Sequence, residues 1–100
     1  MPNFQSYVIN ASPPTNVLIG TTDTQAVAEN NNRLSLVLTN LSSSTLYISL
    51  MGMRSTLNAG IVLLPNGGTW QMDEFTWNTS QINAIAHSAS NILSIQEFIK

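Results

Sequence analysis

The residues of this chain that could carry acid–base chemistry are few, and only two of them are adjacent. His87 is the single histidine, and Asp73 and Glu74 are the only neighbouring carboxylates. Neighbouring side chains of an extended segment point to opposite faces, so these two carboxylates would not share a substrate. Many serines are present, but no Gly-x-Ser-x-Gly sequence would position one as a nucleophile for His87. We therefore expect no catalytic residue and no enzymatic activity.

Metal and cofactor chemistry also lacks the residues that it needs. The chain has no cysteine, and its other acids, Asp23, Glu29 and Glu97, are isolated in the sequence, so no metal-ligand spacing is present. The glycine pair Gly67-Gly68 follows an apolar run but leads into Thr69 and not into a helix, which a phosphate-binding loop requires. We expect neither a metal nor a cofactor.

Side chains suited to recognition are better represented. Trp70, Phe75 and Trp77 fall within eight residues, and such rings suit protein interfaces or could stack on a sugar. Met51 and Met53 flank a glycine and form a second candidate contact patch, because methionine adapts to irregular surfaces. In the alternative interpretation the tryptophans fill the core or cap its rim, and the methionines are ordinary loop-end packing.

Two opposite charges flank the clearest strands. Arg33 stands at the start of one apolar strand, and Glu97 lies near the end of the last one. We hypothesise that they pair across the sheet or across a subunit boundary. The alternative is two exposed charges that contribute about 0–1 kcal/mol.

The charge content limits the classes of partner. Only 8% of residues are charged, against roughly 25% in a typical soluble domain, which suits a protein that lives inside an assembly. The net charge is −2 and the cations are Arg33, Arg54 and Lys100, so a nucleic-acid partner is excluded because no basic stripe is present. The start of the chain has no basic or apolar region of a signal peptide, and no apolar run could span a membrane. We expect synthesis in a reducing cytoplasm, without secretion.

Alternating apolar residues predict strands. Leu34 to Thr39 and Leu46 to Met51 both alternate, and the polar loop between them predicts a hairpin. Ile61 to Leu64 and Thr69 to Met72 flank Pro65-Asn66-Gly67-Gly68, whose Asn-Gly step is typical of a tight hairpin turn.

Further strands are expected over residues 82–86 and 92–98. Turn signals recur about every 8–12 residues, which predicts an all-β fold, a small antiparallel β-sandwich or jelly-roll-like barrel, over residues 16–100. Residues 1–15 are predicted to be an N-terminal arm that ends at Pro13-Pro14, with Tyr7 and Ile9 as interface candidates.

A family resemblance rests on the strand around Arg33. The segment Asn32 to Asn40, N-R-L-S-L-V-L-T-N, resembles the N-R-x-x-L-x-I-x-N strand of small β-sandwich proteins from tailed-phage particles. The segments that follow within residues 17–98 are similar in kind and order: Leu46-Tyr47-Ile48, Gly60-Ile61-Val62-Leu63, Pro65-Asn66-Gly67-Gly68, Ile82 to Ala86, and Ile95 to Phe98.

The resemblance implies a structural role in a virion. It favours a capsid decoration (cement) protein that binds the major capsid protein or another virion protein, made in the host cytoplasm and located in the virion. Copies are expected to form a homo-oligomer, with a trimer favoured. The alternative is a receptor- or glycan-binding module of a fibre or tail, in which Trp70, Trp77 and Asn78 line a shallow site. A third reading, a hydrolase on a jelly-roll scaffold, would rest on His87 alone.

Overall fold

The computed structural model describes residues 8–100, and within them the chain is all-β with no helix. Most strands begin and end close to the limits predicted from alternation. The strands are β1 (Asn10–Ala11), β2 (Thr15–Ile19), β3 (Thr24–Val27), β4 (Arg33–Asn40), β5 (Leu46–Ser49), β6 (Ile61–Leu63), β7 (Thr69–Gln71), β8 (Ile82–Ala86) and β9 (Asn91–Ile99).

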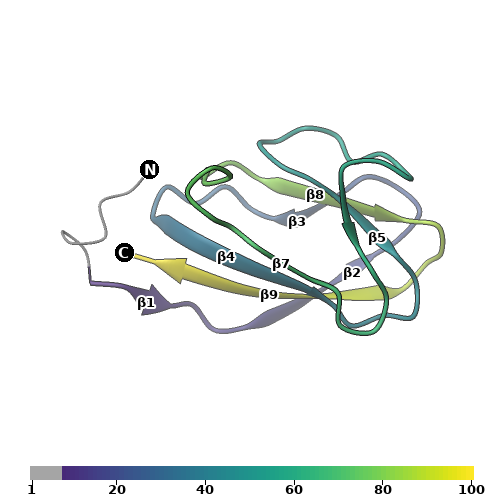
Figure 1. Ribbon diagram of the computed structural model, residues 1–100, viewed down its shortest axis with the longest axis horizontal. Coiled ribbons are helices and arrows are strands. Elements are labelled where there is room, and N and C mark those ends of the chain that lie inside the picture. Colours follow the sequence, from purple (N-terminus) through teal and green to yellow (C-terminus); the bar gives the residue numbers. More distant parts are fainter. Residues whose placement is uncertain (1–7) are drawn as a thin grey trace.

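The strands form two antiparallel sheets, which confirms the predicted small β-sandwich (Figure 1). The first sheet has β9 paired with β4 on one side and with β1 and β2 on the other, and β7 lies beyond β4. The second sheet has the order β3-β8-β5-β6. From β2 to β9 the chain changes sheet at every connection except the one between β5 and β6. This order, β2-β9-β4-β7 facing β3-β8-β5-β6, is that of a jelly roll.

Both predicted hairpins are wrong, because their strands lie in different sheets. β4 pairs with β9 and β7, whereas β5 pairs with β8 and β6. Alternation shows that a strand has one buried face but does not specify its partner. The 65–68 turn has the positive φ values expected at Asn66 and Gly67. The turn binds Asn40 instead of closing a hairpin. The amide of Gly67 donates to the carbonyl of Asn40 at 2.7 Å, and the amide of Asn40 donates to the carbonyl of Gly68 at 2.8 Å.

The segment predicted as an arm contributes to the first sheet where it is described. Asn10 is paired with Ile99, and Thr15 with Ile95, so β1 and β2 follow one edge of β9 in sequence. Pro13-Pro14 separate them, as expected for residues that lack the amide donor or fix φ. The predicted boundary after Thr15 therefore falls inside β2.

The core lies between the two sheets and is aliphatic. Inward-facing positions of both sheets supply it, and Trp70 and Trp77 pack against its margin. The buried cluster consists of Ile19, Ala26, Val27, Leu36, Leu38, Leu46, Ile48, Leu63, Met72, Ile82, Ala84, Ala86, Leu93 and Ile95.

Gly68 is required by the close approach of two backbone segments. A Cβ atom at this position would overlap the backbone carbonyl and amide of Leu64. The turn cannot move away easily, because its amides and carbonyls hold Asn40.

We predict that Gly68→Ala lowers the free energy of unfolding by about 3 kcal/mol, the upper end of overpacking costs. Urea unfolding monitored by tryptophan fluorescence measures this loss. Gly20→Ala is the matched control, because nothing lies within 4 Å of a Cβ placed there, and it should change stability by less than about 0.5 kcal/mol. Equal stabilities of the two variants would contradict the packing argument.

Candidate interaction surface

The outer face of the second sheet is partly covered by the long loop between β5 and β6. Asp23 accepts hydrogen bonds from the amide of Ser55 at 2.8 Å and from its hydroxyl, and from Nδ2 of Asn83 on β8 at 3.0 Å. Farther along the loop, Oδ1 of Asn58 accepts from the hydroxyl of Tyr47 on β5 at 3.0 Å. Ser55 is buried as a result, so the loop is part of the folded unit.

These contacts lower the pKa of Asp23 below its ordinary value. The largest cause is the hydrogen bond from the Ser55 hydroxyl, and the Ser55 amide and Asn83 act in the same direction against a desolvation effect. All these donors favour the ionised carboxylate.

Among residues 8–100 no loop of this kind covers the outer face of the first sheet, and the strand residues on this face are uncharged. The strand register places alternate residues of β2, β9, β4 and β7 on this face, and none of them is buried. They are Asn16, Leu18, Ser35, Val37, Thr39, Thr69, Gln71, Ile92, Ser94, Gln96 and Phe98. We call this set the uncharged face. Leu18 and Ile92 are directly paired on it, with 64% and 38% of their surfaces exposed.

Arg33 and Glu97, the two predicted ion-pair candidates, are brought together within one chain. Nε of Arg33 lies 2.6 Å from Oε2 of Glu97, and the Arg33 side chain is completely buried. Oε1 of Glu97 accepts a second hydrogen bond from Asn30 at 3.3 Å. The pairing is therefore across the β4–β9 contact.

The other nitrogens of Arg33 bind backbone carbonyls of two connections. Nη2 donates to Ala28 at 2.8 Å, and Nη1 donates to Asn78 at 3.1 Å and to Ser80 at 2.8 Å. A planar guanidinium can reach such separate acceptors at once, which an ammonium group cannot. Arg33 thus joins the β3–β4 loop, the β7–β8 loop and β9.

Trp70 and Trp77 contribute mainly to the packing of the fold and less to its accessible surface. Both are partly buried against the core, and Nε1 of Trp77 donates to the backbone carbonyl of Arg33 at 3.0 Å. Asn78 is buried, and its amide donates within its own turn to the carbonyl of Thr76. The three residues proposed for a sugar site therefore do not form an open platform.

The other interface candidates divide by position. Met51 and Met53 are exposed at a turn closed by the Met53 amide and the Leu50 carbonyl. Phe75 is 88% exposed at the β7–β8 turn, and Ile9 is half-exposed before β1. Tyr7 lies outside the described residues.

The residues considered for chemistry are placed apart. Nε2 of His87 lies 2.9 Å from Oδ1 of Asn58, and its ring meets Tyr47 edge to face. Asp73 and Glu74 lie in a tight turn and not in an extended segment, because Oδ1 of Asp73 accepts the amides of Phe75 and Thr76. Among residues 8–100 no group of three or more His, Cys, Asp or Glu side chains is arranged to hold a metal.

Sequence reasoning missed the Asp23 contacts and the uncharged face. Asp23 is separated from Ser55 and Asn83 along the chain, so no local signal points to their contact. The face could have been found by collecting the residues that alternate with the buried apolar residues of these strands, since the polar ones among them are all Ser, Thr, Asn or Gln.

Comparison of the chain with protein-family models, curated proteins and solved structures found no match. In the described part of the chain, no helix has the length and apolar character needed to cross a membrane. The class of molecule defined by the fold is thus a small jelly-roll β-sandwich with one uncharged sheet face.

We predict that Arg33→Met costs about 3–5 kcal/mol of stability, because it leaves Glu97 without its cation. Arg33→Lys keeps the charge but cannot satisfy every carbonyl, and each unpaired one costs about 1–3 kcal/mol. Urea denaturation checks both values. Arg54→Met removes an exposed arginine and should cost less than about 0.5 kcal/mol; a cost equal to that of Arg33→Met would show that the network is unimportant.

Acid should loosen the β5–β6 loop through Asp23. Because the folded pKa of Asp23 is lowered, its stabilising contribution is complete above the ordinary carboxyl pKa of 3.8 and is lost as the pH falls through the folded pKa. Hydrogen exchange at the Ser55 amide, relative to the Leu38 amide in β4, should accelerate below this pH. Asp23→Asn should weaken the pH dependence, whereas Asp73→Asn, whose pKa is also lowered but by Thr76, should leave it unchanged.

Proposed function

We propose that this chain is a structural protein of a tailed-phage virion, a capsid decoration protein that binds the shell and stabilises it. The observation that carries the proposal is the uncharged face. Leu18 and Ile92 are its exposed aliphatic residues, Val37 and Phe98 are half-buried on it, and Ser, Thr, Asn and Gln side chains form the rest. Such a face can be buried against a partner without desolvating an unpaired charge, which would be costly.

The mode of binding is repeated adhesion. A small face contributes a modest affinity, but copies joined to one another and to neighbouring shell subunits gain by avidity. The fold is compatible with this role, because jelly rolls occur in viral capsid and lectin domains, although that is an argument by analogy. The resemblance of the Asn32 to Asn40 strand to phage virion proteins adds to it.

The receptor- or glycan-binding alternative has less support from the geometry. It requires accessible indole faces, whereas Trp70 and Trp77 pack against the core and Trp77 is tied to Arg33. Binding to a glycan array that is lost in a folded Trp77→Ala variant would favour this alternative.

The test is to count copies of the chain in purified virions of a phage that encodes it. We expect many copies per particle, and Leu18→Asp should reduce occupancy at least about tenfold, because it places a charge in the contact. Val62→Asp is the matched control, since Val62 is 49% exposed on the other sheet. Absence of the chain from mature particles would end the proposal, and equal losses in both variants would reject the uncharged face as the docking surface.

A further inference from the structure

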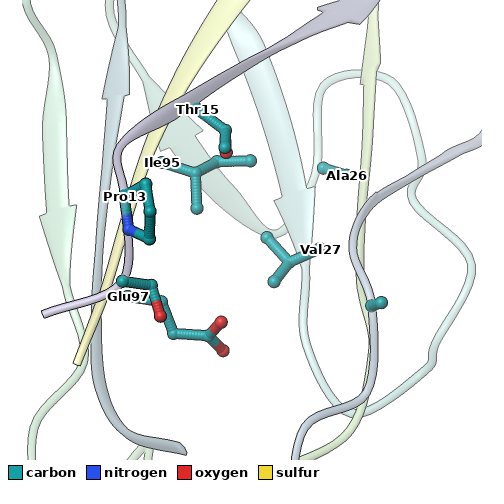
Figure 2. A pocket seen from close by; sticks show the side chains of 8 residues that line it. Pro13, Thr15, Ala26, Val27, Ile95 and Glu97 are labelled. Atoms are coloured by element: carbon teal, nitrogen blue, oxygen red, sulfur yellow. The ribbon is translucent and has the colours of Figure 1, made fainter. Parts of the chain in front are cut away.

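A hollow opens on one long side of the sandwich, between the edges of the two sheets. Figure 2 shows Pro13, Thr15, Ile95 and Glu97 along one side of it, with Ala26 and Val27 of β3 across from them. The hollow is open to solvent and has a volume of about 350 Å³. Its lining residues are Ser12, Pro13, Thr15, Ala26, Val27, Ala28, Ile95 and Glu97.

The inner surface of the hollow is mainly apolar, with Ser12 and Thr15 as its neutral polar residues, and its one charged residue is paired. Thr15 is paired with the inward-facing Ile95, yet Thr15 is exposed, because none of the described residues fills the space in front of it. Val27 and Ile95 belong to the core and form the floor. Glu97 closes one end, with its carboxylate paired to the buried Arg33.

The most exposed large apolar side chain of the described residues is Phe75. Its turn is held by Asp73, whose Oδ1 accepts the amides of Phe75 at 2.9 Å and Thr76 at 3.0 Å and the Thr76 hydroxyl at 3.0 Å. The Asp73 amide in turn donates to the Thr76 hydroxyl at 2.9 Å. The backbone that carries the ring is therefore ordered before any contact forms, so binding costs little backbone entropy, which favours Phe75 as an interface anchor.

Phe75 and the hollow lie next to opposite edges of the first sheet. Phe75 follows β7, the strand at one edge, and the hollow adjoins β2 at the other edge, with β4 and β9 between them. A contact between them joins two copies through different surfaces, which is a heterologous interface that repeats from copy to copy. Such contacts close into a ring or continue as a chain.

We propose that Phe75 of one copy inserts into the hollow of the next copy, so that the chain assembles head to tail. The hollow is large enough for an aromatic ring, and its floor of Val27 and Ile95 is of matching chemistry. Asp73 and Glu74, which precede Phe75, would approach the hollow together with the ring. Because Arg33 neutralises Glu97, the hollow presents no net negative charge that would repel them. This proposal deepens the proposed function and rests on it for its purpose, because it names a contact through which decorating copies join.

The test uses the purified chain and sedimentation velocity over a range of concentrations. The wild-type chain should form oligomers, and Phe75→Ala should weaken association about 30-fold, as for an interface hot spot. Thr15→Trp, which fills the mouth of the hollow from an exposed position, should have a similar effect, and Ala28→Trp provides a second such variant. Leu64→Ala, which truncates another exposed apolar residue, should leave association unchanged.

Mixing the variants gives the sharper result. Phe75→Ala keeps an open hollow and Thr15→Trp keeps the ring, so an equimolar mixture should form a one-to-one dimer but no larger species. A two-fold symmetric interface would not produce this pattern. A wild-type chain that stays monomeric, or association unaffected by Phe75→Ala, would overturn the proposal.

The two proposals fail separately. Self-association is measured without a particle, whereas the proposed function is measured as copies per virion. A monomeric chain that still occupies particles through the uncharged face would reject the head-to-tail contact alone. An oligomer missing from virions would reject the decoration role alone.

Discussion

A guanidinium group enclosed in an all-β domain has to be surrounded by acceptors, because an unpaired buried charge is among the most costly defects of a fold. Arg33 meets this condition with four hydrogen bonds, one to Glu97 and three to backbone carbonyls of Ala28, Asn78 and Ser80. The acceptors come from β9 and from two connections between the sheets. The path of the chain at this end of the sandwich therefore depends on one side chain.

The other end of β4 is organised by a buried amide. Nδ2 of Asn40 donates to the carbonyls of Ser44 and Leu63, and Oδ1 accepts the amide and hydroxyl of Ser42. Leu63 belongs to the second sheet, so this side chain also joins the two layers. Among described residues no buried side-chain nitrogen or oxygen lacks a hydrogen-bond partner, so both polar ends are fully satisfied. β4 thus contributes aliphatic core residues from its middle and, at each end, one buried polar side chain whose hydrogen bonds hold neighbouring segments in place.

Alternation predicted the class of fold and the position of most strands, since a half-buried strand leaves that pattern in the sequence. It could not predict pairing, and it therefore joined β4 to β5, which lie in different sheets. Nor could it predict the burial of Arg33, because strict alternation from Leu34 places Arg33 outside. The register shift between Arg33 and Ser35 accompanies the burial of both Arg33 and Leu34, and a β-bulge has no reliable sequence signal. Of the site residues, the pairing of Arg33 with Glu97 within one chain was one of three interpretations of the sequence, whereas the burial of Trp70 and Trp77 was left open.

The loop over the second sheet makes the domain two-sided. Within residues 8–100, one broad side is strand surface without a covering loop and is suited to contact with a flat support. The other side bears the 50–60 segment held by Asp23 and Asn58. A molecule seated on its bare side would present that segment to the surrounding medium. Changes of length around the exposed Met51-Gly52-Met53 tip would then alter what the assembled surface displays, while the seating side and the core remain the same.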